Sequence, residues 1–298
     1  MARSSGSSGA GGAPIFLVGT GRCGSTIAYS LLAMHPDLAW IPSWVSALPR
    51  IPALAFANRV WSLPGTDRFR EIRFVPKPVE PIMFFRHHLR NYTAEHVDDT
   101  VLSEGRARLV PMLERIRRSH GRARFLGKLV GRPVKVELLA ALFPDAYFVH
   151  VTRDLRPTVS SFLKVDFYER TGLLDPWPWS PIPPEHLEFF EQAGRPQELV
   201  AAIQVTANLA ELNRQLALAP PERQLEVPYA AFVADPIGQV RRVCALADLP
   251  VDGRYERRLL ARRLVQGADQ KWMKHFDAAQ IRNLDGFEAL TTNSTNTA

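Results

Sequence analysis

The chain has 298 residues, of which 46% are hydrophobic and 22% charged, a composition that excludes a fibrous or disordered protein and indicates a folded globular one. A net charge of +7 favours an anionic ligand, while two cysteines argue against a disulfide framework and a cysteine-based zinc site. No apolar run reaches the roughly 20 residues that span a bilayer, and the N-terminus lacks a signal-peptide core. We therefore expect a cytoplasmic protein without a transmembrane segment.

Polar ends flank one expected domain. Residues 1–13 form a Gly/Ser leader and residues 291–298 a polar tail, and we expect both to be disordered. Residues 14–290 then form a single domain. Within it, the Pro- and aromatic-rich segments 36–92 and 165–191 predict irregular walls, which suit a ligand pocket or lid, an oligomer contact, or packing around long loops.

The most informative motif is an apolar strand-like run that passes through a glycine-rich turn into a helix, over residues 15–34. Free N–H groups and the helix dipole make such a junction an anion site. Gly19 and Gly24 bracket four residues, as in a P-loop. However, Ser25 stands in the place of the P-loop lysine, and Arg22 is the only cation inside the loop. The loop therefore predicts a phosphate or sulfate site, but not an ordinary ATP or GTP site.

Later apolar bursts alternate with helical patterns, which predicts buried parallel strands and an α/β fold. The helix signals include two N-cap aspartates, one of them followed by proline. The expected strands are 124–127, 146–151 and 225–228, and the expected helices run from Asp154 to about Lys164, over 198–218, and onward from Asp235 and Pro236.

A second strand-to-helix junction carries Arg153 and Ser161. Asp154 caps the helix there, and Ser161 lies seven residues beyond the cap, two helical turns along the same face. Arginine with a hydroxyl is a common way to bind a second phosphate. Together with the loop at 19–26, the junction predicts one ligand that has two separated anionic groups.

This combination resembles the PAPS-dependent sulfotransferase superfamily, whose donor is 3′-phosphoadenosine 5′-phosphosulfate (PAPS). The loop at 19–26, followed by His-Pro-Asp at 35–37, is similar to the 5′-phosphosulfate loop of that family. Arg153 with Ser161, eight residues apart, is similar to its 3′-phosphate motif. The resemblance covers about residues 14–290. It implies a three-layer α/β/α fold with a central parallel sheet, a P-loop NTPase-like sulfotransferase fold.

The resemblance implies in-line transfer of a sulfuryl group from PAPS to a hydroxyl or amine of a small-molecule, carbohydrate or lipid acceptor, with no metal. Lys128 would neutralise charge on the sulfate or leaving group. Tyr229 resembles the tyrosine that approaches the adenine, and Lys271 with Trp272 a donor-binding turn of bacterial relatives. The residues expected to bind the donor are Gly21, Arg22, Cys23, Gly24, Ser25, Thr26, Arg153, Ser161, Tyr229, Lys271 and Trp272.

The general base is missing from both positions that the family uses. Val130 stands where cytosolic members have a histidine, and residues 38–45 lack the glutamate of tyrosylprotein-type members. We choose Glu80, an isolated acid between prolines and large apolar residues, where burial would raise its pKa. His87 and His88 are the alternatives, because histidine titrates near neutral pH. An exposed loop glutamate and a polar surface patch are the competing interpretations of these residues.

Other functions stay open at this point. A non-catalytic nucleotide- or sulfate-binding relative would keep the loop and lack a base. A P-loop nucleotide kinase would need the lysine that Ser25 replaces and a Walker B acid, which we do not find at the end of an apolar strand. Nucleic acid is not an expected partner, because the arginines are scattered at helical spacings and no nucleic-acid module is recognised.

Overall fold

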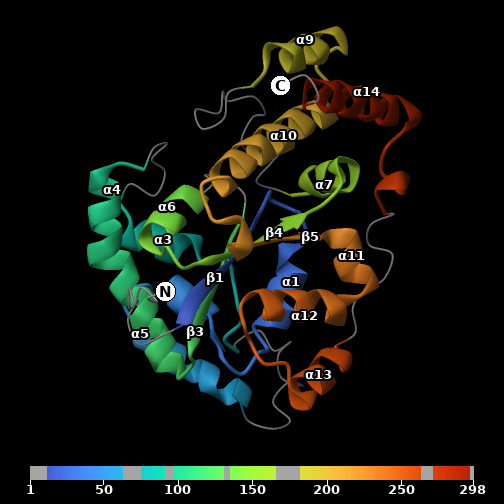
Figure 1. The fold of residues 1–298 in the computed structure, drawn as a ribbon. Coiled ribbons are helices and arrows are strands. Elements are labelled where there is room, and N and C mark those ends of the chain that lie inside the picture. The colour runs from blue at the N-terminus through green and yellow to red at the C-terminus, as the bar shows by residue number, and fades with distance from the viewer. Residues whose placement is uncertain are drawn as a thin grey trace, which may run out of the picture.

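The structure, a computed structural model, describes residues 12–62, 75–90, 97–130, 135–165, 182–262 and 271–295. In this part of the chain five strands form one parallel sheet with helices on both faces (Figure 1). The expected α/β fold with a central parallel sheet is confirmed. In spatial order the strands are β2 (Leu38–Ala39), β3 (Arg124–Val130), β1 (Gly12–Gly19), β4 (Tyr147–Thr152) and β5 (Gln224–Pro228).

Strand β1 lies at the centre of the sheet, between β3 and β4. Its residues Ile15, Phe16, Leu17 and Val18 are at most 2% exposed. Ile15 and Leu17 join the hydrophobic cluster on one face, while Phe16 and Val18 join the cluster on the other. An uninterrupted apolar run is what a parallel strand with both faces covered requires. The loop that follows β1 is therefore anchored to a fully buried strand of the core.

Helices complete the two outer layers, and further helices build a third cluster at one end of the molecule, around α10 (Figure 1). Within the described residues, no helix combines the length and the apolar character needed to cross a bilayer. The predicted cytoplasmic location stays a prediction. The helices are α1 (Ser25–Leu32), α12 (Pro236–Leu246) and α13 (Gly253–Leu260) on one face; α2 (Ser43–Ala47), η1 (Pro52–Ser62), α3 (Ile82–His88), α4 (Asp99–Glu104), η3 (Gly105–Leu109), α5 (Val110–His120) and α6 (Val136–Leu142) on the other; α7 (Leu155–Phe162), α9 (Pro184–Gln192), α10 (Gln197–Leu216) and α14 (Ala278–Thr295) in the third cluster; and η4 (Pro221–Arg223), α11 (Tyr229–Ala234) and η5 (Lys271–Lys274) as connecting elements.

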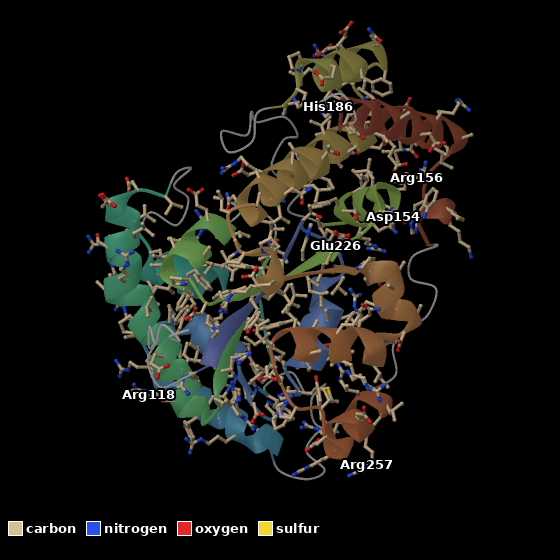
Figure 2. The ribbon with its side chains drawn as sticks, in the orientation of Figure 1. Arg118, Asp154, Arg156, His186, Glu226 and Arg257 are labelled. Carbon is tan, nitrogen blue, oxygen red and sulfur yellow. The ribbon has the colours of Figure 1, made fainter. Side chains whose placement is uncertain are left out.

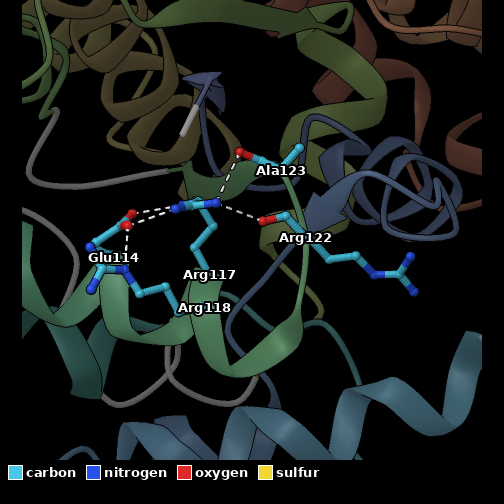
Figure 3. Close-up of polar contacts among 5 residues, drawn as sticks. All are labelled: Glu114, Arg117, Arg118, Arg122 and Ala123. Carbon is cyan, nitrogen blue, oxygen red and sulfur yellow. Dashed lines mark hydrogen bonds and ion pairs between the residues drawn. The ribbon is translucent and has the colours of Figure 1, made fainter. Parts of the chain in front are cut away.

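One arginine fixes the turn from α5 into β3 (Figure 3). The guanidinium of Arg117 donates to the carbonyl oxygens of Arg122 and Ala123, at 2.8 and 3.3 Å. The same group pairs with Glu114 at 2.6 Å, within its own helix. Because these bonds involve a charged donor, they are stronger than bonds between neutral groups. They hold the chain in the direction that carries β3 into the sheet beside β1.

The ends of the described chain differ from the expectation of disorder. β1 begins at Gly12, inside the predicted leader, and its amide donates to the carbonyl of Ala123. Helix α14 continues to Thr295, inside the predicted tail. Leu284 and Phe287 of this helix are buried in the third cluster, and this contact is invisible in the polar composition of the last residues. For these positions the prediction of disorder is wrong.

The Pro-rich segments contain short helices where we expected irregular walls. Pro52 begins η1 and Pro184 begins α9. A proline in the first turn lacks only an N–H group that the helix does not use, so it marks a helix start. The centre of the second segment, 175–179, lies outside the described residues.

One of the two predicted N-caps is confirmed. The Asp235 carboxylate accepts from the amide of Gly238 at 2.9 Å, and Pro236 takes the first position of α12. Asp154 precedes α7, but its side chain makes no capping hydrogen bond. An aspartate precedes both helices, as expected, but the backbone conformations of Asp154 and Asp235 differ and only Asp235 makes the capping bond.

We expect Asp235→Ala to lower the free energy of unfolding by about 1 kcal/mol, because an amide at the start of α12 loses its acceptor. Asp154→Ala is the matched control, since it removes an aspartate from the same position of a helix without removing a capping bond. Chemical denaturation of both variants measures the difference. Equal losses would contradict a cap at Asp235.

Candidate functional site

The residues predicted to form the site lie near the ends of four neighbouring strands, at one edge of the sheet. Because the strands are parallel, their carboxyl ends share an edge, where open α/β sheets bind ligands. The loop at 19–26 leaves β1, Lys128 lies near the end of β3, Arg153 follows β4 and Tyr229 follows β5. These strands are neighbours in the order β3-β1-β4-β5. Residues from distant parts of the sequence therefore meet around the loop.

The loop between β1 and α1 has the geometry of an anion site. Arg22 and Gly24 have φ values of 66° and 90°, in the left-handed region on either side of Cys23. Left-handed residues inside a turn aim successive N–H groups toward a common point. Gly24 is also the N-cap of α1, and as a glycine it offers no side chain to cap this helix end. The first N–H groups and the positive end of the helix dipole consequently face the loop.

A close approach explains why residue 24 is glycine. A Cβ atom at this position would lie 2.1 Å from Cδ2 of Tyr229. The Tyr229 ring is buried, and the guanidinium carbon of Arg153 lies 4.5 Å from its centroid. Tyr229 therefore packs against the loop and holds Arg153 through a cation–π contact. Its approach to an adenine stays a prediction.

The two predicted anion motifs are in direct contact. Nε of Arg22 in the loop donates to Oγ of Ser161 on α7 at 2.9 Å. A guanidinium nitrogen of Arg153 donates to the carbonyl oxygen of Arg22 at 3.2 Å. The ring of Phe162 on α7 also packs against the loop, since a Cβ on Gly21 would lie 2.8 Å from it. The loop therefore contacts both ends of α7, through Arg153 just before the helix and through Ser161 and Phe162 at its end.

Glu80 lies beside Lys128 at this edge of the sheet. Lys128 is buried, and its Nζ donates to Oγ1 of Thr26 at 2.9 Å. The same Nζ lies 3.7 Å from Oε2 of Glu80, while Oε1 of Glu80 accepts from the amide of Val130 at 3.1 Å. With its side chain 23% exposed, Glu80 is not a solvated loop residue. Burial raises the pKa of Glu80, and Lys128 with the Val130 amide offsets only part of this effect.

Tyr29 is a polar residue of this region that our sequence analysis missed. It lies on α1, one turn beyond Thr26, and is buried. Its hydroxyl has no hydrogen-bond partner among the described residues. Burial and the charge of Glu80 both raise the pKa of Tyr29, so the phenol stays neutral near the carboxylate. The only signal in the sequence was the spacing of three residues from Thr26.

The histidine alternatives lie elsewhere. The carbonyl oxygen of His87 accepts from Arg108 at 3.1 Å, and the His87 ring stands edge-on to His88. His88 is buried, and its Nε2 donates to the carbonyl of Pro49 at 3.0 Å. Within the described residues neither ring bonds to Glu80 or Lys128. His88 is therefore not part of an exposed polar patch, and of the three candidates it is Glu80 that lies beside Lys128.

The predicted C-terminal donor turn, η5, packs against α7. The ring centroid of Trp272 lies 5.7 Å from the guanidinium carbon of Arg156, which Figure 2 labels. Arg156 in turn pairs with Asp285 and Glu288 of α14, at 2.6 and 2.8 Å. The side chain of Lys271 lies outside the described residues. The helix that carries Ser161 thus also holds the turn that carries Trp272.

A family model described as "Sulfotransferase family" matches residues 14–253. The chain belongs to the sulfotransferase family. The fold is similar to that of sulfotransferase STF9 from Mycobacterium avium, with a TM-score of 0.55 and 15% identity over 96% of this chain and 77% of that one. It is also similar to sulfotransferase STF1 from Mycobacterium tuberculosis H37Rv, with a TM-score of 0.50 and 18% identity over 87% of this chain and 73% of that one. None of the curated proteins matches the chain.

In this sulfotransferase Cys23 packs inside the loop. It is fully buried, and burial raises the pKa of its thiol in spite of a hydrogen bond with Ser25. A Cβ on Gly19 would lie 2.8 Å from its sulfur. Such a thiol is not a reactive thiolate. In the part of the chain that the structure describes, no group of His, Cys, Asp and Glu side chains could hold a metal.

We expect Gly24→Ala to lower the free energy of unfolding by at least about 2 kcal/mol, because the methyl group meets the Tyr229 ring and the backbone is left-handed. Gly194→Ala is the matched control. Its φ of 79° is similar, but nothing lies within 4 Å of the added Cβ, so we expect about 1 kcal/mol from the backbone alone. Chemical denaturation separates the two terms. Similar losses in both variants would refute the steric argument.

Proposed function

We propose that this sulfotransferase transfers a sulfuryl group from PAPS to an acceptor hydroxyl, with Glu80 as the general base. The observation that carries the proposal is that Lys128 contacts both Glu80 and Thr26, beside the loop at 19–26. A small-molecule, carbohydrate or lipid hydroxyl is the acceptor that this chemistry suits, and an amine would use the same groups.

The residues present fit a donor with two anionic ends. The left-handed residues Arg22 and Gly24 turn backbone N–H groups of the loop toward one point, where a phosphosulfate would bind. Arg22 and Thr26 would add a cation and a hydroxyl at that end. Arg153 and Ser161 would hold the 3′-phosphate, because Arg153 is already fixed over Tyr229 at the start of α7. Lys271 and Trp272 would complete the donor site from η5.

Bound PAPS supplies the sulfuryl group, and the protein supplies position, charge and a proton acceptor. Oε1 of Glu80 is held by the Val130 amide, so its Oε2 is the atom that takes the proton from the acceptor hydroxyl. Lys128 stands 3.7 Å from Oε2 and would stabilise negative charge that develops on the leaving phosphate. Thr26 orients the Lys128 ammonium by accepting its hydrogen bond.

Two observations support this proposal over the alternatives. A P-loop kinase needs a lysine where this chain has Ser25, which is buried beside Cys23. A non-catalytic relative would have no acid at the reacting edge, whereas Glu80 lies there with a raised pKa. Perturbed carboxyl groups of this kind concentrate at functional sites.

We expect Glu80→Gln to lower turnover by about 10²- to 10⁴-fold, because the amide accepts no proton. Affinity for 3′-phosphoadenosine 5′-phosphate (PAP), the desulfated donor, should not change, because Glu80 lies outside the donor contacts. Transfer from PAPS to a panel of phenol, sugar and sterol acceptors measures turnover, and calorimetry measures PAP binding. His87→Gln is the discriminating variant, and we expect it to keep its activity.

The pH profile tests the same assignment. A raised pKa keeps Glu80 protonated to a higher pH than an ordinary glutamate, so the rate falls as the pH drops through that raised value. We expect this acid limb in the wild type and not in the residual activity of Glu80→Gln. Full activity of Glu80→Gln, or an unchanged acid limb, would remove Glu80 from the role of base.

We expect Arg153→Ala to weaken PAP binding by about ten- to a hundredfold and to leave adenosine 5′-phosphate binding nearly unchanged, because only PAP carries a 3′-phosphate. Arg118→Ala is the matched control, since Arg118 lies on α5, away from the loop at 19–26, and already pairs with Glu114 at 2.8 Å. Titration of each variant with both nucleotides gives the comparison. An equal loss for both nucleotides would contradict a 3′-phosphate contact.

A further inference from the structure

Of the eleven large hydrophobic side chains that are exposed among the described residues, five lie on two short segments of this protein. Single exposed hydrophobic residues are normal on a protein surface, but a cluster marks a contact surface. The exposed members are Trp44 at 40%, Leu48 at 53% and Ile51 at 47% in the first segment, and Ile82 at 40% and Met83 at 62% in the second.

The two segments lie side by side. Helix α2 packs against α3, and the amide of Ser43 donates to the carbonyl of Lys77 at 2.9 Å. Further along, Nε2 of His88 donates to the carbonyl of Pro49 at 3.0 Å. Bonds before and after the exposed side chains thus tie the segments together. We call the surface of Trp44, Leu48, Ile51, Ile82 and Met83 the apolar patch.

The charged residues within the two segments that carry the apolar patch are arginines, and Glu80, 23% exposed, lies just before the second segment. Residues 43–62 and 81–90 contain no aspartate or glutamate. Arg50 and Arg86 are exposed there, and neither forms an ion pair in the described part of the chain. Protruding aliphatic and tryptophan side chains with arginines around them form the pattern of a surface that enters the headgroup region of a bilayer. Anionic headgroups complement the charge.

We propose that the apolar patch binds the surface of an anionic lipid bilayer. Leu48 and Met83, the most exposed members, enter the boundary between headgroups and acyl chains, and Arg50 and Arg86 contact lipid phosphates. The proposal goes beyond the proposed function and does not depend on it, because the binding needs neither donor nor base. Glu80 lies two residues before Ile82, so a bilayer bound at the apolar patch would lie close to the edge of the sheet that carries Glu80.

Co-sedimentation with vesicles tests the proposal. We expect the wild type to bind vesicles of phosphatidylcholine with phosphatidylglycerol and not vesicles of phosphatidylcholine alone. Leu48→Ser with Met83→Ser should lower the partition coefficient on the order of tenfold. Arg50→Ala with Arg86→Ala should weaken binding and flatten its dependence on salt. Leu218→Ser with Leu260→Ser is the matched control, since these side chains are 56% and 70% exposed on other elements, and it should bind as the wild type does.

Three results would overturn the proposal. One is a wild type that does not bind the anionic vesicles. Another is equal loss, or no loss, in the patch and control variants, which would reduce the binding to the attraction of a protein with a net charge of +7. The last is a wild-type dimer that the patch substitutions dissociate while vesicles are not bound, which would make a second copy the occupant. The arginine pair keeps the test decisive if the serine variants unfold, as thermal unfolding will show.

Discussion

The parallel arrangement of the sheet is the constraint on which the rest of this structure depends. Because every strand runs in the same direction, every carboxyl end lies at one edge, and the central position of β1 places its loop between the ends of β3 and β4. The loop has no lysine of its own, yet Lys128 reaches it from β3 and Arg153 from β4. Charge that an ordinary P-loop carries within its own sequence is supplied here by neighbouring strands.

Features with a local cause could be predicted from the sequence. The buried run of β1, the glycine turn and the cap at Asp235 are each set by residues within a few positions of one another. The helix at 198–218 was found within two residues at each end, as Gln197–Leu216, because its apolar stripe has a helical period. Glu80 was recognised by composition alone, as an acid in apolar surroundings.

Features that depend on contacts between distant segments could not be predicted. Residue 24 is glycine because the Tyr229 ring occupies the space that a side chain would fill. No residue near Gly24 in the sequence indicates this contact. The two-residue strand β2 is too short to leave a periodic signal. The same holds for the Tyr29 hydroxyl, whose significance lies in the carboxylate near it. Proline misled us for a different reason, because it breaks a helix interior and also favours a helix start.

The surroundings of Glu80 exert two opposing effects on its pKa. Removing a carboxylate from water disfavours its charge, and a neighbouring ammonium favours it. At 3.7 Å the ammonium of Lys128 is close enough to attract but not to form a short hydrogen bond. Desolvation therefore wins, and the pKa of Glu80 is raised. A carboxyl group in this balance responds strongly to any new charge beside it.

The hydrogen bond from Val130 to Glu80 also bears on how the sheet ends. β2 pairs only with Arg124 and Phe125, so the outer side of β3 continues past its strand partner. Leu126, Gly127 and Lys128 on this stretch are buried, so its backbone donors lie away from water and need acceptors within the protein. The Glu80 carboxylate occupies the last of these donors and places a negative charge on the edge. The same side chain thereby satisfies a backbone donor beyond the end of β2 that would otherwise lie half-buried without an acceptor.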